Sequence, residues 1–146
     1  MGYLQVIGGG KNQKKLAEDA ACFAVQKLLP KARKYSIKIK LGSDTDDCFE
    51  FDDRYYVINI NKKQSGDDFL TAIFHEIVHV KQYIYDNLLD NYKFSAHKNG
   101  MIFWEDYINH PAEKEAYKMQ EVLLKQWKMN LNLKVGEITK TQKQKV

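Results

Sequence analysis

One long helical pattern around residues 75–79 constrains the fold of this chain more than any other feature. The run DDFLTAIFHEIVHVKQYIYDNLL carries two lines of apolar residues at helical spacing. The first line contains Phe69, Ile73, Ile77, Val80 and Ile84, and the second contains Leu70, Phe74 and Val78. Because these lines leave a single polar stripe, the pattern predicts a helix that is buried on most sides.

The polar stripe holds His75 and His79, which belong to the motif H-E-x-x-H. Residues four apart on a helix differ by about 40° around its axis, so both imidazoles point the same way. Neutral imidazoles at this spacing can bind one Zn²⁺ ion at about 2.0–2.1 Å. Glu76 lies on the flank of that face, where it can accept a proton from a zinc-activated water instead of binding the metal. A pair of hydrogen-bonded core histidines is the alternative explanation.

A catalytic zinc ion normally has three protein ligands and a water, so a third ligand must come from elsewhere. Glu113 is the preferred candidate, because its carboxylate would offset the charge of the metal. Glutamate in a first helical turn also suits the helix macrodipole. The side chains of Glu113 and Glu115 would point in directions about 200° apart around a helix axis, so one rigid turn cannot direct both to the same ion. The open alternatives are Glu115, His110, His97 and no third ligand at all.

Alternating apolar and polar residues predict strands upstream of the motif. Residues 35–41, YSIKIKL, alternate strictly, and residues 48–51 and 55–61 read as a hairpin. The Gly-Gly-Gly run at residues 8–10 is interpreted as a flexible lead-in, and Ser65 with Asp68 resembles a capping box. The expected fold is α+β: a small antiparallel sheet of about three strands plus a short hairpin at residues 92–104. This sheet is expected to pack on an N-terminal helix, the central H-E-x-x-H helix and a C-terminal helix that Pro111 begins.

Length and charge limit the classes of protein to consider. The 146 residues suit one domain over residues 1–132, followed by a basic tail over 133–146 that is expected to be flexible. The net charge is +4, but only Arg33 and Arg54 supply guanidinium groups, which disfavours base-specific nucleic-acid recognition and leaves only loose association. No apolar run is long enough for a membrane span, and the two cysteines form no C-x-x-C pair. We therefore expect a cytoplasmic protein without a membrane partner, while the sequence leaves the oligomeric state open.

The pairing of HEIVHVKQY with the later PAEKEAY resembles the gluzincin branch of the zincin metallopeptidases. It is similar to the small single-domain SprT-like and ImmA-like peptidases, some of which phages encode. In that pattern a glutamate in an E-x-x-A element follows the H-E-x-x-H helix, and here this element is Glu113-Lys114-Glu115-Ala116. The resemblance covers roughly residues 67–120. SprT-like proteins often use a downstream histidine as the ligand, which keeps His97 as an alternative.

The resemblance implies a zinc metalloendopeptidase that hydrolyses peptide or protein substrates. One Zn²⁺ ion would be bound by His75, His79 and Glu113, with Glu76 as the general base. Further candidates are Tyr107, Tyr117 and His110 for contacts to the substrate or transition state, and Gln82 and Asp86 for orienting the imidazoles. The strand at residues 55–60 is expected either to bind an extended peptide by strand addition or to lie inside the sheet.

Two other functions compete with this interpretation. The chain could be an inactive zincin-fold binding module, in which zinc is structural or absent and the fold binds a protein partner or loosely associates with nucleic acid. A helical–sheet protein with no metal and an accidental H-E-x-x-H motif is the second competitor. Glu76 argues against a purely structural zinc site, because such a site needs no base.

Overall fold

The computed structural model describes residues 2–86 and 110–144, with the side chains of residues 2–85 and 110–132. The described chain forms four strands, three α-helices and a π-helical turn. They are β1 (Tyr3–Ile7), α1 (Lys11–Leu28), β2 (Ser36–Ser43), β3 (Asp47–Asp52), β4 (Tyr55–Asn61), α2 (Gly66–Lys81), η1 (Gln82–Asp86) and α5 (Pro111–Gln144). The predicted α+β class is confirmed, and the hairpin expected at residues 92–104 lies outside the described residues.

The sheet is mixed and has four strands in the order β1-β2-β4-β3, so the prediction of a purely antiparallel sheet is wrong. β1 pairs with β2 and β2 pairs with β4 in parallel, while β3 and β4 are antiparallel. Helix α1 returns the chain from the end of β1 to the start of β2, and such a helical crossover produces parallel neighbours. β4 has a hydrogen-bonded strand on each side, which excludes strand addition at residues 55–60 and confirms the interior alternative.

The three glycines at positions 8–10 form a tight turn between β1 and α1, and the prediction of a flexible lead-in is therefore wrong. Gly8 and Gly9 adopt positive φ angles of 81° and 71°. A Cβ atom on Gly8 would lie 2.7 Å from the carbonyl oxygen of Leu41, so a side chain there would collide with β2. Because Gly8 and Gly9 have no side chains, the chain can turn tightly here, and α1 packs against the sheet.

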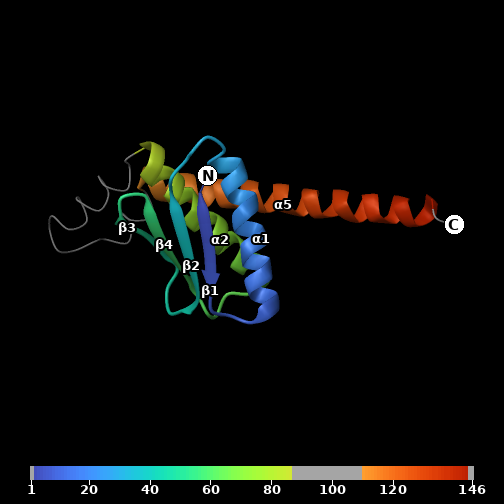
Figure 1. The fold of residues 1–146 in the computed structure, drawn as a ribbon, viewed down its shortest axis with the longest axis horizontal. Helices are drawn as coiled ribbons and strands as arrows, with labels where there is room; N and C mark the ends of the chain where they lie inside the picture. Colours follow the sequence, from blue (N-terminus) through green and yellow to red (C-terminus); the bar gives the residue numbers. More distant parts are fainter. Residues whose placement is uncertain (1, 87–109, 145–146) are drawn as a thin grey trace.

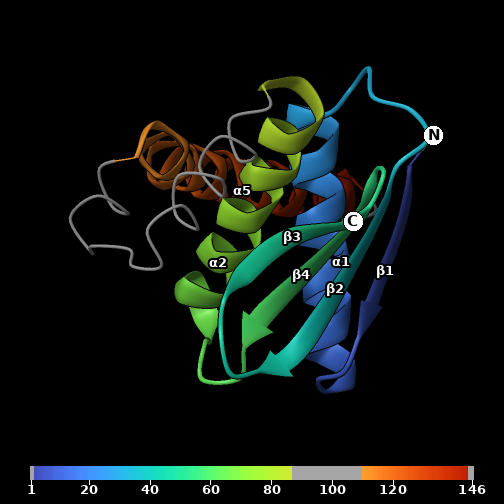
Figure 2. The same ribbon diagram turned by 90° about the vertical axis from the view of Figure 1, so that its left-hand side faces the viewer.

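All three α-helices lie on one face of the sheet (Figure 1, Figure 2). The strands direct their apolar residues toward this layer, as Ile37, Ile39 and Leu41 of β2 show by their burial. α2 lies in the centre, and its residues from Phe69 to Val80 are all buried except half-buried Thr71. The prediction of a helix buried on most sides is confirmed.

A cluster of three aromatic rings joins the helices behind the sheet. The ring of Phe23 in α1 lies 6.2 Å from Phe74 in α2 and 5.5 Å from Trp127 in α5, measured between centroids. Such tilted and edge-on pairs are favourable geometries for aromatic contacts. The cluster fixes α5 beside α2, which matters because each helix contributes to the site described below.

The end of α5 extends beyond the rest of the described chain (Figure 1). The backbone of residues 133–144, expected as a flexible tail, continues this helix. None of the helices in the described part of the chain is long and apolar enough to cross a membrane.

Candidate metal centre

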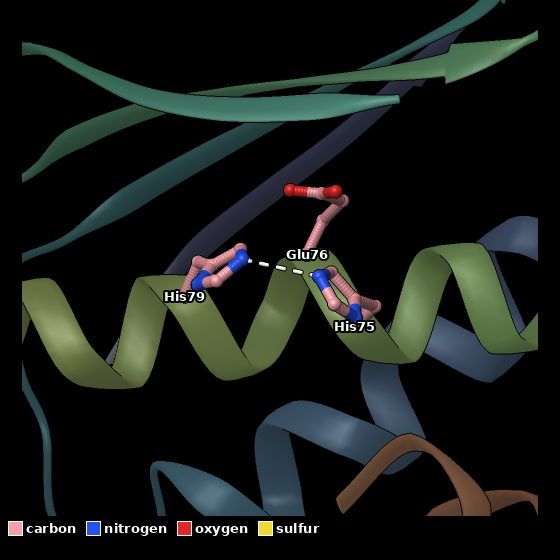
Figure 3. Close-up of side chains that lie close together, drawn as sticks. All are labelled: His75, Glu76 and His79. Carbon is pink, nitrogen blue, oxygen red and sulfur yellow. Dashed lines mark hydrogen bonds between the residues drawn. The ribbon is translucent and has the colours of Figure 1, made fainter. Parts of the chain in front are cut away.

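Helix α2 brings His75 and His79 together on one side (Figure 3). Their Nε2 atoms lie 3.2 Å apart, and the rings meet edge-on with centroids 4.8 Å apart. Both residues are buried, at 8% and 5% exposure. The predicted convergence of the two imidazoles is therefore present in the structure.

Glu113, in the first turn of α5, completes a ring of three donor groups. Its Oε2 lies 3.2 Å from Nε2 of His75, and its Oε1 lies 2.9 Å from Nε2 of His79. In a regular tetrahedron with metal–ligand bonds of about 2.0–2.1 Å, neighbouring donor atoms lie about 3.3 Å apart. The distance between the two Nε2 atoms and the distance from each of them to one Glu113 oxygen are all close to that edge, so the donor groups lie at suitable distances for one zinc ion.

Two glutamines fix the proton positions on the imidazoles. His75 Nδ1 lies 2.8 Å from Oε1 of Gln120, and His79 Nδ1 lies 2.7 Å from Oε1 of Gln82. Because an amide oxygen only accepts hydrogen bonds, each Nδ1 carries a proton and donates it. In the neutral rings, the lone pair is then on Nε2, which faces the other imidazole and Glu113. Lone pairs that converge in this way need a cation or extra protons between them.

The carboxylate of Glu113 stays ionised in this environment. Burial alone would raise its pKa, but when the imidazoles of His75 and His79 also carry a proton on Nε2, their hydrogen bonds and charges outweigh burial and lower the pKa to about 2. Glu113 is only 2% exposed. A buried negative charge surrounded by imidazoles fits the binding of a divalent cation.

Glu76 has a different environment from Glu113. Its carboxylate extends from α2 toward the sheet (Figure 3), and its Oε2 is buried with no hydrogen-bond partner among the described residues. Burial, followed by the charges of Glu113, Asp46 and Asp47, raises its pKa well above the usual value. The ligand atoms of His75, Glu76 and His79 lie within 4.8 Å of one another, but Glu113 is nearer to both imidazoles. Glu113 is thus the better-placed third ligand, and Glu76 remains available for proton transfer.

A cleft of about 260 Å³ opens beside His75 and Glu76. Its walls come from the loops that precede β3 and α2, from the first turns of α2 and from one face of α5. The other residues that line it are Asp46, Gln64, Asp68, Thr71, Ala72, Tyr117 and Gln120. The two groups with roles in the predicted chemistry are therefore accessible from a cavity.

The alternative third ligands have other contacts or lie outside the described chain. The carboxylate of Glu115 accepts hydrogen bonds from Gln82 at 2.9 Å and Lys81 at 3.4 Å. Nδ1 of His110 accepts the backbone N–H of Ala112 at 3.1 Å, which caps the start of α5. Burial lowers the pKa of His110, and the charge of Glu113 partly opposes this effect. His97 lies outside the described residues.

The remaining predicted site residues divide into two groups. Tyr117 packs edge-on against His75, with 4.8 Å between ring centroids, and burial raises the pKa of its phenol. Gln82 is fully buried, orients His79, and donates a hydrogen bond to the Ala112 carbonyl at 3.0 Å. Tyr107 and the side chain of Asp86 lie outside the described residues.

Sequence reasoning missed Gln120, although a signal for it was present. Gln120 lies seven residues after Glu113, and two helical turns return almost to the same face. A polar residue on the same helical face as a proposed ligand is a candidate hydrogen-bond partner for an imidazole that this ligand contacts. The lining residues Asp46 and Gln64 had no such signal, because they come from loops.

Comparisons of the chain with protein-family models, with curated proteins and with solved structures find no match.

Proposed function

We propose that the protein is a zinc-dependent metalloendopeptidase of the gluzincin type that hydrolyses peptide bonds. One observation carries the proposal: the buried Nε2 atoms of His75 and His79 lie 3.2 Å apart, and each also lies within 3.2 Å of an oxygen of the Glu113 carboxylate. Without a cation or extra protons these acceptors would repel one another, and the arrangement would destabilise the fold. The order of motif and downstream glutamate is also that of the gluzincins, which the sequence resembles.

The donor set favours zinc among the common metal ions. Two imidazoles and one carboxylate suit zinc, while magnesium and calcium prefer oxygen ligands. Three protein ligands are typical of catalytic zinc sites, whereas structural sites usually have four. When bound, zinc supplies Lewis acidity and lowers the pKa of a water ligand to about 7.

Glu76 is the proposed general base of the reaction. A raised pKa brings a carboxylate closer to neutral pH, where it can both accept and return a proton. Its unpaired Oε2 leaves one acceptor position open for a donor from water or substrate. Tyr117 lines the same cleft, and a phenol with a raised pKa keeps its proton and can donate it to a developing oxyanion.

The proposed substrates are peptides or proteins, with no narrower class. We place the protein in the cytoplasm, where cysteines such as Cys22 and Cys48 stay reduced. The competing proposal, an inactive binding module, leaves without a role the buried Oε2 of Glu76, which has no hydrogen-bond partner among the described residues.

Glu76→Gln tests the proposal against this competitor. The zinc-loaded variant should keep stoichiometric metal and lose about 10²–10⁴-fold in the rate of peptide hydrolysis, because the general base is gone. Zinc content is measured by elemental analysis of untagged protein, and the rate with quenched fluorescent peptides. Glu18→Gln, a substitution in α1, is the matched control and should change neither quantity. Equal rates for parent and Glu76→Gln would exclude Glu76 as the base.

A further inference from the structure

The cleft beside His75 and Glu76 is negatively charged although the whole chain is basic. The net charge of the sequence is +4, yet the described residues that line this cavity include no lysine or arginine. Asp46 and Asp68 both line it, and neither has a lysine or arginine partner within the described residues. Their neighbours differ in this respect, because Asp44 pairs with Lys62 at 3.2 Å and Asp67 pairs with Lys128 at 2.6 Å.

The two carboxylates are positioned in different ways. Asp46 accepts the backbone N–H of Asn61 at 2.6 Å and a hydrogen bond from the side chain of Gln64, so the loop fixes its orientation. Asp68 lies in the first turn of α2, where the predicted capping box with Ser65 is not formed, because Ser65 makes no capping hydrogen bond. The carboxylate of Asp68 is exposed and has no side-chain hydrogen bond within the described part of the chain.

A separate observation indicates that the cleft receives a polar group. Glu76 is 4% exposed and lines the cleft, and its buried Oε2 has no donor among the described residues. Ala72 is the one aliphatic residue among the described residues of the lining, so a large apolar side chain would find little apolar surface there. The volume of about 260 Å³ is below the roughly 300–1,000 Å³ of small-molecule sites, which suits a single side chain.

We propose that this cleft binds a lysine or arginine side chain of the substrate beside the cleaved bond, with Asp46 and Asp68 as its carboxylate partners. This inference depends on the proposed peptidase function for the identity of the ligand as a peptide. Gln64 and Thr71 supply neutral hydrogen-bonding groups at the rim of the same cleft. The peptidase therefore selects its cleavage sites by charge and not by apolar contact.

Matched peptides test the preference directly. Three series of quenched fluorescent peptides differ in one residue, which is lysine, norleucine or glutamate. Within each series, this residue occupies a different position in each peptide. When the varied residue occupies the position that binds in the cleft, the kcat/KM of the zinc-loaded parent should be at least about tenfold higher for the lysine peptide than for the glutamate peptide. Equal cleavage of the lysine, norleucine and glutamate peptides at every position would overturn the proposal.

Asp68→Asn localises the preference to this cleft. The variant should lower the lysine-to-norleucine ratio by about threefold to fivefold, the loss expected for a partly exposed ion pair. Cleavage of the norleucine peptide should change less than cleavage of the lysine peptide. Asp67→Asn is the matched control, because Asp67 occupies the same helical turn but faces Lys128. An equal loss for lysine and norleucine peptides in Asp68→Asn would contradict the assignment.

A binding measurement separates failure of the cleft from failure of the enzyme. Fluorescence anisotropy of the same labelled peptides with zinc-loaded parent and Asp68→Asn gives dissociation constants. If no peptide is cleaved, the proposed peptidase function fails. The cationic subsite is still supported if the parent binds the lysine peptide more tightly than the other two peptides and if Asp68→Asn weakens that binding. Equal binding of all three peptides to the parent would overturn the subsite.

Discussion

Two buried contacts organise the helices, and they differ in chemistry. The layer between α1 and the sheet is apolar, with residues such as Ala20 and Ile39 fully buried. The junction of α2 with α5 buries His79, Glu113 and Gln82 instead. The first contact is stabilised by removing apolar surface from water, whereas the second must pair every polar group that it buries. One region therefore maintains the fold, and we propose that the other depends on a cation.

The largest expected effect tests this dependence on a cation. In the parent, zinc at about 1,000 times its Kd should raise the free energy of unfolding by about 4 kcal/mol. Glu113→Ala should lose most of this gain and its stoichiometric zinc, because two imidazoles bind the metal weakly. Urea unfolding with and without a chelator gives the difference. Glu115→Ala is the control and should respond to zinc like the parent, since Glu115 faces Gln82 and Lys81. A full zinc response in Glu113→Ala would exclude this residue as the third ligand.

The apolar contact should respond in the opposite way. Ile39→Ala should lower the free energy of unfolding by about 2–5 kcal/mol, because it removes buried methyl groups and leaves a cavity. The loss should be the same with zinc and with chelator, since Ile39 belongs to the apolar core and contributes no donor group. Lys40→Ala, at the next and exposed position of β2, is the control with little expected change. A loss that depends on zinc would show that the two regions are coupled.

Gln120 refines the comparison, because it contacts His75 and is not one of the proposed metal ligands. Gln120→Ala should weaken zinc affinity by about 10–100-fold, since His75 loses the acceptor that fixes its ring. Competition with a chromophoric chelator measures the affinity. Gln120→Glu keeps an acceptor oxygen and should restore most of the affinity. Unchanged affinity in Gln120→Ala would mean that the helix alone orients His75.

The smallest effect is expected at the surface of the same junction. Lys128→Ala removes the ion pair with Asp67, which links α5 to the start of α2. Both side chains are more than half exposed, at 52% and 58%, so the free energy of unfolding should fall by only about 0.2–1 kcal/mol. Urea unfolding at low and high salt measures this loss, which salt should reduce. A loss well above this range that salt does not change would show that the exposed pair is part of the buried junction.

The sequence predicted the candidate donor residues of the site and missed Gln120, which contacts one of them. Helical periodicity and the H-E-x-x-H spacing are local, so the convergence of His75 and His79 followed directly from them. Glu113 was predicted from its place in the next helix, and its contact with both imidazoles is present in the structure. Gln120 was missed because a glutamine on a half-exposed helical face has the same pattern whether it faces solvent or an imidazole.

The topology of the sheet was harder to predict for a physical reason. Alternation in residues 35–41 shows which side chains face the core, but it carries no information on strand direction or neighbours. Strand β1 has five residues and pairs in parallel with β2 across the whole of α1. The position of β4 inside the sheet depends on the same long-range pairing, which no local pattern encodes.

Gln82 links three parts of the chain, because it contacts His79, the Ala112 carbonyl and Glu115. The proposed metal ligands are likewise divided between two helices that are far apart in the sequence. A nascent chain would therefore have no complete binding site until the second helix is synthesised and docks. The metal content of a preparation would then measure the fraction of correctly assembled molecules. Titration of the bound metal with a chelator would show, by difference, the fraction of molecules that are misfolded.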